Sequence, residues 1–369
     1  MRSHQRRAWI EVDLSALSNN ATFLKERART PLLPMVKADA YGLGVGPVVQ
    51  ALEALDPWGY GVATIEEGAE LRSLGITRPV LVFTPLLPDD FADVRYYRLT
   101  PTLGDEARIH AWHSSGGGEW HLAIDTGMNR AGIPWDRVTD LEWVLKSCEP
   151  EGAFTHFHSA EQDDGSMQEQ LQRFDQAIVA LPSRPKYLHA ENSPALSRSA
   201  PSRWDLARPG VFLYGVGDSL TLPDAPFGSQ LKWECLPVVS LHARIVEIRD
   251  VAEGETVSYG GTWEAKGVRR VATVAAGYAD GIRRNLSNRG MALVNGLRAP
   301  IAGIVTMDMT MLDVTDVACN VGDVATFLGP QGDHQLPIMD VAASGELSPY
   351  ELLVGLGLRA PRFYVYKTS

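Results

Sequence analysis

The feature that most constrains the fold is an alternation of β-rich and helix-like segments over the first two-thirds of the chain. Helix-like stretches such as IEEGAELRSLG and SMQEQLQRFDQAIVAL separate the β-rich runs. This pattern is typical of parallel α/β folds, in which consecutive strands are joined by crossover helices. Eight candidate strands occur in this part of the chain: LLPMVKA, GYGVATI, PVLVFTP, RLTPTL, WHLAIDTG, GAFTHFH, KYLHAEN and DLARPG.

Eight strand–helix units in about 230 residues predict a (β/α)8 barrel. The alternative is an open doubly wound sheet, but the sequence has no G-x-G-x-x-G turn, and GLGVG after Lys37 has a different spacing. After about residue 230 the chain changes to strand-like runs separated by turn residues. We therefore predict an α/β barrel domain over residues 1–230 and a mostly β domain over residues 231–369.

Two features are expected near the C-terminus. In SPYELLVGLG, Ser348 can cap a helix that has Pro349 at its first position. The segment RAPRFYVYK is expected to form a last strand.

The composition narrows the class of protein. The 369 residues are 45% hydrophobic and 21% charged, as in an ordinary globular enzyme. The net charge of −11 argues against nucleic-acid binding, and no apolar run reaches the ~20 residues that a membrane span needs. Cys148, Cys235 and Cys319 have no metal-binding spacing and indicate buried thiols in a reducing compartment. We expect a cytoplasmic protein without a metal site.

Polar residues occur where the predicted barrel strands end. In a (β/α)8 barrel these ends open onto one face, where the active sites of this fold lie. Lys37 follows the first strand, and Tyr41 follows closely. An amine can form an imine with an aldehyde cofactor, and a phenol can help hold a phosphate, so this pair indicates pyridoxal phosphate chemistry. The other residues at strand ends are Arg130, His156, His189, Ser193, Arg208 and Gly210.

These residues also have separate structural interpretations. Lys37 can be a solvated strand end, His156 a core histidine, Arg130 a surface partner of Asp125, Ser193 a helix cap, Gly210 a turn residue, and Tyr278 of GYADG a packing aromatic. One cofactor at the barrel mouth explains the residues at the barrel strand ends together, whereas the structural interpretation needs a separate cause for each. For Tyr278, packing is the favoured interpretation from the residues alone.

Eight motifs occur in an order and approximate spacing that resemble a known family. They are VKADAYG, DTGMNRAG, THFHSA, ENSPA, RPGVFLYG, VSYGGTW, GYADG and MDMT. Together they resemble the alanine racemases, two-domain enzymes of fold type III that use pyridoxal 5′-phosphate, and the resemblance runs from EVDLSAL to RAPR. It implies interconversion of L-alanine and D-alanine, a supply of D-alanine as a cell-wall precursor, and a head-to-tail homodimer with shared active sites.

The resemblance implies a role for each matching residue. Lys37 would carry the cofactor and act as one catalytic base, and Tyr278 of the partner subunit would act as the other. Arg130 and the N–H of Met307 of the partner subunit would hold the substrate carboxylate. The remaining cofactor contacts would be Tyr41, Ser193, Gly210 and Val211 at the phosphate, Arg208 at the pyridine nitrogen, and His156 and His189 in a network linking Tyr278 to Arg208.

Racemisation by this scheme needs two bases on opposite faces of the substrate Cα. Lys37 would serve the D side and Tyr278 of the partner subunit the L side. A phenol that acts as a base near neutral pH needs positive charge nearby, which we expect Arg208 and His156 to supply. Arg208 keeps its proton, so it cannot protonate the ring nitrogen, and this favours racemisation over transamination.

Four positions depart from the family pattern. Ala123 stands where many relatives have a lysine that can be carbamylated to brace the arginine at position 130. The other three are Ile304 in place of an arginine, Glu161 in place of an aspartate, and Leu358 in place of a tyrosine. A serine racemase or a racemase of broader specificity stays open, because one methylene of misfit costs only ~1–3 kcal/mol.

Two further classes of function stay open from the sequence. One is another enzyme on the same barrel, such as an amino-acid decarboxylase or a D-threonine aldolase relative, against which the GYADG and MDMT motifs argue. The other is a non-enzymatic pyridoxal phosphate carrier. Relatives of that kind are bare barrels, whereas this chain adds about 140 residues of β domain.

Overall fold

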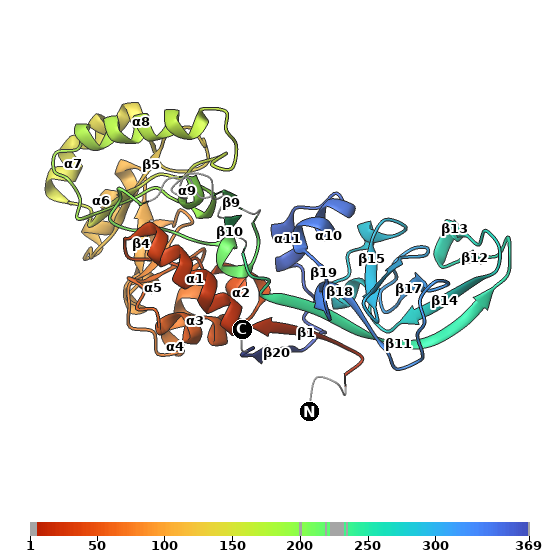
Figure 1. Cartoon of the computed structure of the whole chain (residues 1–369). Coiled ribbons are helices and arrows are strands. Elements are labelled where there is room, and N and C mark those ends of the chain that lie inside the picture. Colours follow the sequence, from red (N-terminus) through yellow and green to blue (C-terminus); the bar gives the residue numbers. More distant parts are fainter. Residues whose placement is uncertain (1–5, 199–200, 218–219, 222–231, 234, 368–369) are drawn as a thin grey trace.

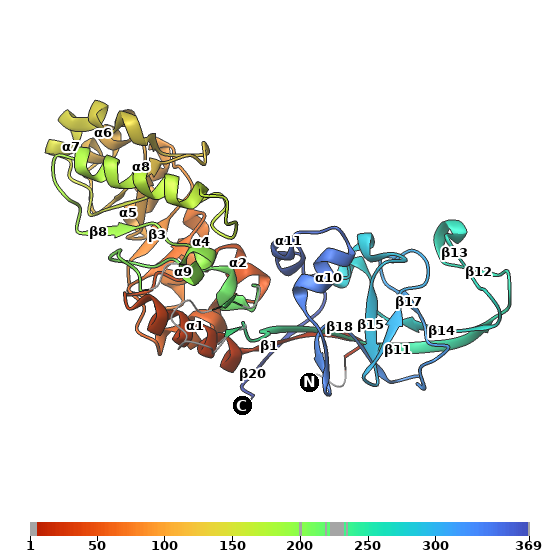
Figure 2. The same cartoon turned by 45° about the horizontal axis from the view of Figure 1, so that its top comes forward.

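The computed structural model describes residues 6–198, 201–217, 220–221, 232–233 and 235–367. Figure 1 shows an α/β region and a mostly β region side by side, and the rotated view in Figure 2 shows the same separation. Three strands run between the two regions: β1 (Ala8–Asp13), the long β11 (Val239–Val251) and β20 (Arg362–Val365).

Parallel strands form the centre of the α/β region. Their order is β2-β3-β4-β5-β7-β8, and each neighbouring pair is parallel. The strands are β2 (Tyr60–Val62), β3 (Val80–Val82), β4 (Thr100–Leu103), β5 (His121–Asp125), β7 (Gly152–Phe154) and β8 (Tyr187–His189), with β6 (Ile133–Pro134) beside β5.

The first and eighth predicted segments close this sheet without forming full strands. Pro34 and Pro209 lie in these segments, and because proline has no N–H they interrupt the hydrogen-bond ladder. The closing contacts are the parallel bridges Met35–Gly61 and Leu32–Ala207 and the 2.9 Å hydrogen bond from the Asp205 N–H to the Leu188 carbonyl. The ring is therefore continuous, which confirms the predicted barrel and excludes the open sheet.

Helices lie between the barrel strands, as the sequence predicts. The two stretches singled out there correspond to α4 (Ile65–Ser73) and α8 (Ser166–Ala180). Thr64 begins α4 with a capping box, in which Thr64 and Glu67 each accept a hydrogen bond from the other's backbone N–H. The other helices of this region are α1 (Leu14–Ala28), α2 (Lys37–Gly42), α3 (Val45–Glu53), α5 (Phe91–Tyr96), α6 (Glu106–Ser114), α7 (Glu142–Ser147) and α9 (Ser193–Arg198), and 3₁₀ turns span Pro88–Asp90, Trp135–Leu141 and Val211–Tyr214.

A mostly antiparallel sheet organises the second region, in the order β16-β15-β18-β11-β1-β20, with β14 and β17 continuing from β11. The first strand of the chain, β1, thus lies in this sheet, antiparallel to β11 and parallel to β20. The predicted boundary at residue 230 lies outside the described residues. The other strands of this sheet are β14 (Arg269–Val274), β15 (Met291–Val294), β16 (Leu297–Pro300), β17 (Thr310–Asp313), β18 (Val324–Gln331) and β19 (His334–Leu336). Two separate two-stranded sheets consist of β9 (Leu220–Thr221) with β10 (Lys232–Trp233) and of β12 (Thr256–Val257) with β13 (Trp263–Glu264).

The C-terminal segment connects the two regions. It contains α10 (Ile338–Ser344) and α11 (Pro349–Val354), which Ser348 caps by accepting from the Tyr350 N–H. The predicted helix and last strand are therefore confirmed. Helix α11 packs on α2, and Arg362 Nε donates to the Gly42 carbonyl at 2.9 Å. The end of the chain thus braces the turn that follows Lys37.

The described residues also bear on the expectations from composition. Cys148 and Cys319 are buried free cysteines, and Cys235 is partly buried. Among the helices of the described residues, none combines the length and the apolar character that a membrane crossing requires.

Candidate active site

Lys37 opens a left-handed turn at the end of the first barrel segment. Ala38, Asp39, Ala40 and Tyr41 have φ values of 55°, 54°, 52° and 56°. Each such residue with a Cβ costs ~1–2 kcal/mol, so neighbouring contacts have to hold the turn. They are the hydrogen bonds from the Ala38 N–H to Glu67 Oε1 at 2.7 Å, from the Val45 N–H to Asp39 Oδ1 at 2.7 Å, and from the Ala40 N–H to the Val36 carbonyl at 2.9 Å. Backbone strain held in this way is typical of functional sites.

The surroundings of Lys37 favour a reactive amine. Burial and the positive charge of Arg130 lower the pKa of Lys37, while Glu67 opposes the shift. A larger fraction of the amine is therefore neutral near physiological pH, and the neutral form is the nucleophile. Glu67 acts on Lys37 and on the backbone that follows it, although the sequence analysis assigned it no role. The Thr64–Glu67 capping-box spacing was the signal that could have found it.

Arg130 is exposed at the mouth of the barrel, after β5. Among the described residues, no hydrogen bond or ion pair holds its guanidinium. Asp125 instead accepts from the N–H groups of Gly127, at 2.9 Å, and Asn129, at 3.1 Å. The alternative of a surface pair between Arg130 and Asp125 is therefore not what this structure contains.

A group of donors suited to a phosphate lies around Ser193 and Gly210. Ser193 Oγ accepts from the Gly210 N–H at 2.8 Å and from the Phe212 N–H at 3.4 Å. Gly210 is required here because a Cβ at this position would lie 2.7 Å from Tyr41 Oη. The Val211 N–H begins a 3₁₀ turn, and such turns begin with free donors. The Ser193 hydroxyl and the Val211 N–H thus lie together as donors, as a phosphate needs, and the Gly210 N–H beside them is held by Ser193 Oγ.

Tyr41 is fixed by a second tyrosine. Its ring stacks on Tyr214, with 4.6 Å between the ring centroids, and Tyr214 Oη donates to the Met35 carbonyl at 2.8 Å. Burial raises the pKa of both phenols, so Tyr41 keeps its proton and remains a hydrogen-bond donor. Tyr214 lies in the RPGVFLYG motif, but the sequence analysis gave it no role.

Arg208 is almost completely buried, with 3% of its surface exposed. Nη1 donates to His189 Nδ1 and to the His189 carbonyl, both at 2.8 Å. Nη2 donates to the Thr155 carbonyl at 2.7 Å and the Ala190 carbonyl at 3.1 Å, and lies 3.4 Å from His156 Nδ1. The Nε–H group of Arg208 has no protein acceptor among the described residues. Burial lowers the pKa of Arg208 to about 9, against the effect of Glu191, so it remains charged near neutral pH.

His156 lies where three cations from distant parts of the chain converge. Burial lowers its pKa to about 3, and Arg208, Arg130 and Lys37 each add to this shift. The expectation that His156 is itself a cation is therefore wrong for this structure, because burial first, and then the surrounding positive charge, keep the imidazole neutral. Arg208 remains the source of positive charge on this side of the site.

Tyr278 and Met307 lie together in the β region, at an exposed turn. Their relative exposures are 41% and 51%. The Tyr278 N–H donates to the Thr306 carbonyl at 2.9 Å, so the two loops are joined through the backbone. Gly277 permits this contact, since a Cβ there would lie 2.1 Å from the Thr306 oxygen.

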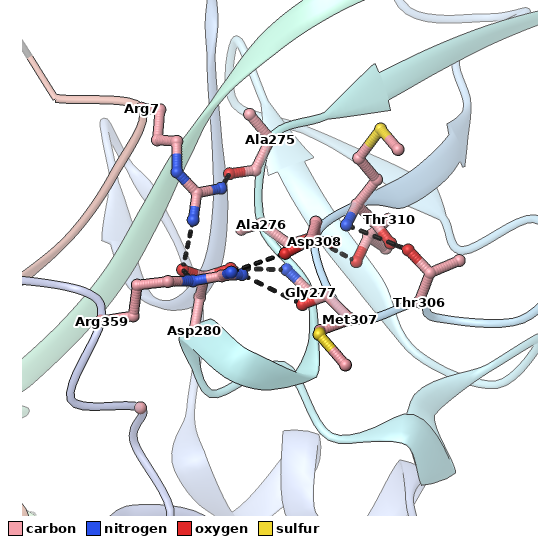
Figure 3. A network of polar contacts seen from close by, with 12 residues as sticks. Arg7, Ala275, Ala276, Gly277, Asp280, Thr306, Met307, Asp308, Thr310 and Arg359 are labelled. Carbon is pink, nitrogen blue, oxygen red and sulfur yellow. Dashed lines mark hydrogen bonds and ion pairs between the residues drawn. The ribbon is translucent and has the colours of Figure 1, made fainter.

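One carboxylate holds this exposed turn in place. Asp280 is fully buried and accepts from the Gly277 N–H at 2.9 Å, from Arg7 Nη2 at 2.9 Å and from Arg359 Nη2 at 2.6 Å. Figure 3 shows Arg7 and Arg359 reaching Asp280 from two sides, with Arg359 also contacting Asp308 and the Met307 carbonyl. The sequence analysis missed this cluster. Arg7 and Arg359 lie near opposite ends of the chain and Asp280 lies far from both, so no local pattern marks them.

The structure therefore brings together one part of the predicted site and leaves another part separate. Lys37, Tyr41, Arg130, His156, His189, Ser193, Arg208, Gly210 and Val211 lie at the barrel. Tyr278 and Met307 lie in the β region, and among the described residues no hydrogen bond, ion pair or ring contact joins them to those barrel residues.

The four positions that depart from the family pattern have ordinary surroundings. Ala123 is buried in β5, and the Ile304 carbonyl accepts from Ser258 Oγ at 2.7 Å. Leu358 is 89% exposed. Glu161 is also exposed, and with burial it raises the pKa of Tyr350 on α11. Tyr350 in turn adds to the raised pKa of Tyr41, so α11 brings a phenol near Tyr41 that the sequence analysis did not foresee.

The donor set at the barrel mouth fits a phosphorylated aldehyde cofactor. It offers a partly buried amine with a lowered pKa, a phosphate-sized group of hydroxyl and N–H donors, and one unpaired guanidinium N–H. This defines the class of protein as a barrel enzyme that carries such a cofactor on a lysine.

Comparisons with known proteins identify the family. The family descriptions "Alanine racemase, N-terminal domain" and "Alanine racemase, C-terminal domain" match residues 12–218 and 238–364. An alanine racemase of Carboxydothermus hydrogenoformans is 37% identical over 373 residues, which cover 98% of this chain and 100% of that protein. The chain therefore belongs to the alanine racemase family, as its motifs predict.

Solved structures agree with this assignment. The alanine racemase of Bacillus anthracis, determined with bound L-Ala-P, has a TM-score of 0.86 and 31% identity, covering 98% of this chain and 95% of that one. The alanine racemase of Bartonella henselae, determined with covalently bound pyridoxal phosphate, has a TM-score of 0.87 and 27% identity, covering 98% and 100%.

Proposed function

We propose that this protein is a pyridoxal 5′-phosphate-dependent racemase that interconverts L-alanine and D-alanine. Its D-alanine would serve as a cell-wall precursor. We also propose that it works in the cytoplasm, where its free cysteines stay reduced. Family membership over nearly the whole chain supports the reaction type.

The observation that carries the proposal is the gathering of positive charge at His156: Arg208 Nη2 lies 3.4 Å from its Nδ1, and Arg130 and Lys37 act on it as well. These cations come from three different strand ends of the barrel, and each has a separate task in the reaction. A barrel that served only as a scaffold would have no reason to gather three cations around a buried neutral imidazole, since their mutual repulsion is unfavourable.

The barrel residues would bind and orient the reactants. Ser193, Tyr41 and the N–H groups of Gly210 and Val211 would hold the phosphate, and Arg208 Nε–H would donate to the ring nitrogen. Arg130, which has no protein partner among the described residues, is free to pair with the substrate carboxylate. When bound, the cofactor draws electron density from the Cα–H bond of the amino acid.

Two side chains would move the proton. The Lys37 amine, with its lowered pKa, takes or returns the proton on the D side of Cα. The Tyr278 phenol does so on the L side. Arg208 keeps its own proton, because a pKa of about 9 leaves it charged, so charge stays near Cα and reprotonation gives the racemised amino acid.

We propose that Tyr278 and Met307 reach the site from a second copy of the chain. The support is their exposure of 41% and 51% at one turn, away from the barrel residues of their own chain. A head-to-tail homodimer would cover this turn and place one phenol over each Lys37. The Met307 N–H of the partner subunit would then help hold the substrate carboxylate.

The test is direct. The purified protein is incubated with pyridoxal phosphate, reduced with borohydride and digested, and the modified peptide is identified by mass spectrometry. We expect the label on Lys37, together with exchange of the Cα proton of alanine for deuterium and loss of optical rotation. Modification of Lys37 without Cα exchange for any amino acid in a panel would instead indicate a carrier.

A further inference from the structure

A line of buried polar side chains leads from Arg208 across the barrel toward its surface. Arg208 Nη1 donates to His189 Nδ1 at 2.8 Å, and His189 Nε2 lies 2.8 Å from His121 Nδ1. Both imidazoles are fully buried. Beyond them, His121 Nε2 lies 3.8 Å from Glu151 Oε2, and Glu151 Oε1 lies 3.6 Å from Lys186 Nζ. The line thus joins the guanidinium in the site to a carboxylate near the outside.

The barrel wall leaves space for this line. His121 begins β5, Gly152 begins β7 and His189 ends β8, which are neighbouring strands. A Cβ at Gly152 would lie 2.4 Å from the His121 ring, so the imidazole occupies the space that a side chain on β7 would fill. The fit indicates that His121 is accommodated by its neighbours and is not a chance occupant of the core.

The chemistry of arginine fixes both histidine tautomers. A guanidinium only donates hydrogen bonds, so His189 Nδ1 must accept and its proton must be on Nε2. That proton is donated to His121 Nδ1, so the proton of His121 must also be on Nε2. Burial lowers the pKa of both histidines, which agrees with two neutral rings.

The far end of the line has a polar atom that needs a partner. Among the described residues, His121 Nε2 has no hydrogen-bond acceptor, although it is buried. Glu151 Oε2 lies 3.8 Å from it, and His121 is the main cause of the lowered pKa of this carboxylate. Every N–H in the line therefore points from the guanidinium toward the carboxylate, which is the direction in which such bonds strengthen one another.

We propose that Glu151, His121 and His189 form a polarised relay that positions Arg208 and holds the proton on its guanidinium, so that Nε–H donates to the ring nitrogen of the cofactor without transferring its proton. They are positioning residues, because they act through Arg208 and do not contact the reacting atoms. With Nη1 and Nη2 fixed by the protein, Nε–H is the donor left for the cofactor. The expected effect of the relay on the reaction outcome rests on the proposed function. The existence of the relay does not.

The first test needs no cofactor and no activity. The apoprotein is labelled with ¹⁵N-histidine, and the tautomers of His121 and His189 are determined by NMR near neutral pH. His121→Gln and His189→Gln serve only to assign the signals. We expect Nε2–H on both rings. A proton on Nδ1 of either ring, or a charged imidazole, would overturn the relay even if the protein proved to be an active racemase.

The second test compares two substitutions in one loop. Glu151→Gln removes the charge at the end of the relay, and Glu149→Gln removes an exposed charge two residues away, whose partner is Ser183. We expect Glu151→Gln to shift the ¹⁵N signals of His121 and to raise the ratio of transamination to racemisation on the order of fivefold, with KM for alanine unchanged. Glu149→Gln should leave both unchanged.

The outcomes separate the two proposals. If both substitutions give the wild-type ratio and the wild-type histidine signals, Glu151 is no part of a relay. If the tautomers are as stated but the protein binds no pyridoxal phosphate, the relay stands and the proposed function fails. Thermal unfolding of both variants checks that folding is intact, and the tautomers of the unmodified protein decide the matter if Glu151→Gln does not fold.

Discussion

The barrel half and the β half of the proposed site are built in opposite ways. Arg208 in the barrel is 3% exposed, whereas Tyr278 and Met307 in the β region are 41% and 51% exposed. The barrel half lies within one chain, where neighbouring residues fix Nη1 and Nη2 of Arg208 and leave Nε–H for a ligand. The β half presents groups that lack any such surroundings. The difference supports the proposal that a second copy of the chain covers the β half in a shared active site.

The two halves also differ in what holds them. Arg208 is fixed by several carbonyl groups and two histidines, so no single neighbour carries the whole arrangement. The turn with Tyr278 depends on one carboxylate, Asp280, which joins it to Arg7 and Arg359. The account therefore predicts gradual effects from changes around Arg208 and a concentrated effect from a change at Asp280.

The largest expected effect is at the amine. Lys37→Ala should abolish cofactor attachment and lower racemase activity by at least ~10³-fold, because it removes both the attachment point and one base. The exposed Lys146, paired with Glu142 on α7, provides the control substitution Lys146→Ala. Borohydride labelling and a coupled racemase assay measure both variants. Retention of label elsewhere with full activity in Lys37→Ala would contradict the assignment.

Tyr278→Phe should come next, and it sharpens the comparison between the halves. Activity should fall ~10²- to 10⁴-fold, mainly by slowing proton removal from L-alanine. The stability of the single chain should not change, because within its own chain the phenol is exposed and its hydroxyl has no partner among the described residues. Solvent deuterium incorporation in each direction and a melting curve check this. Equal activity in the phenylalanine variant would remove the two-base scheme.

Asp280→Asn should weaken the β half without touching a reacting group. The substitution removes the buried charge that pairs with both Arg7 and Arg359 and leaves a neutral amide in its place, at a cost of about 2–4 kcal/mol in the free energy of unfolding. Racemase activity should also fall, because the turn that carries Tyr278 loses its support.

Asp308→Asn is the matched control for Asp280→Asn. Both aspartates pair with Arg359, but the Asp308 side chain is 54% exposed, so its removal should cost less than ~1 kcal/mol. Chemical denaturation of both variants gives the comparison. Equal destabilisation would contradict the central role given to Asp280.

Acid should destabilise the barrel before the β region. Burial lowers the pKa of three barrel histidines, His121, His156 and His189. In the β region, burial lowers the pKa of His242 to about 4. The unfolded chain protonates these rings below about pH 6.5 while the folded chain does not, so stability is full above that pH and falls below it. Each ring contributes ~1.4 kcal/mol per pH unit in that range. Hydrogen exchange between pH 7 and 5 should show barrel peptides losing protection first, and uniform loss would contradict this.

Glu191 acts in the opposite sense. Burial raises its pKa to about 7, so its contribution to stability is present below the pKa of an exposed glutamate, ~4.3, and is lost as the pH rises to about 7. Glu191→Gln should therefore make the apoprotein less dependent on pH between these values. Melting temperatures at several pH values would show this smallest effect, and an unchanged pH profile would argue against a buried, protonatable Glu191.

The sequence predicted those elements of the fold that depend on residues close together in the chain. The alternation of strand-like and helix-like segments predicted the barrel. The capping residue Ser348 predicted the helix that follows it, and the strand-like segment RAPRFYVYK predicted the last strand. Two strands became single bridges because Pro34 and Pro209 interrupt the ladder. The placement of β1 in the second sheet was not predicted, since pairing with β11 joins residues more than two hundred positions apart.

The site shows the same limit. Lys37, Arg208 and Gly210 could be found because each lies in a motif at a strand end. The charge of His156 could not, because its neutral state depends on cations that only the fold brings near. The same holds for the His189–His121 contact and for Asp280 with its two arginines, which are tertiary contacts without a sequence period.

The most direct test of the shared site mixes two inactive variants. Lys37→Ala and Tyr278→Phe are each nearly inactive alone, and they are refolded together in equal amounts so that subunits combine at random. A mixed dimer then has one site with both defects and one intact site, so activity should recover to about a quarter of the wild-type value. Native mass spectrometry confirms that mixed dimers form. If mixed dimers are present and activity stays at the sum of the two variants, Lys37 and Tyr278 do not act from different chains.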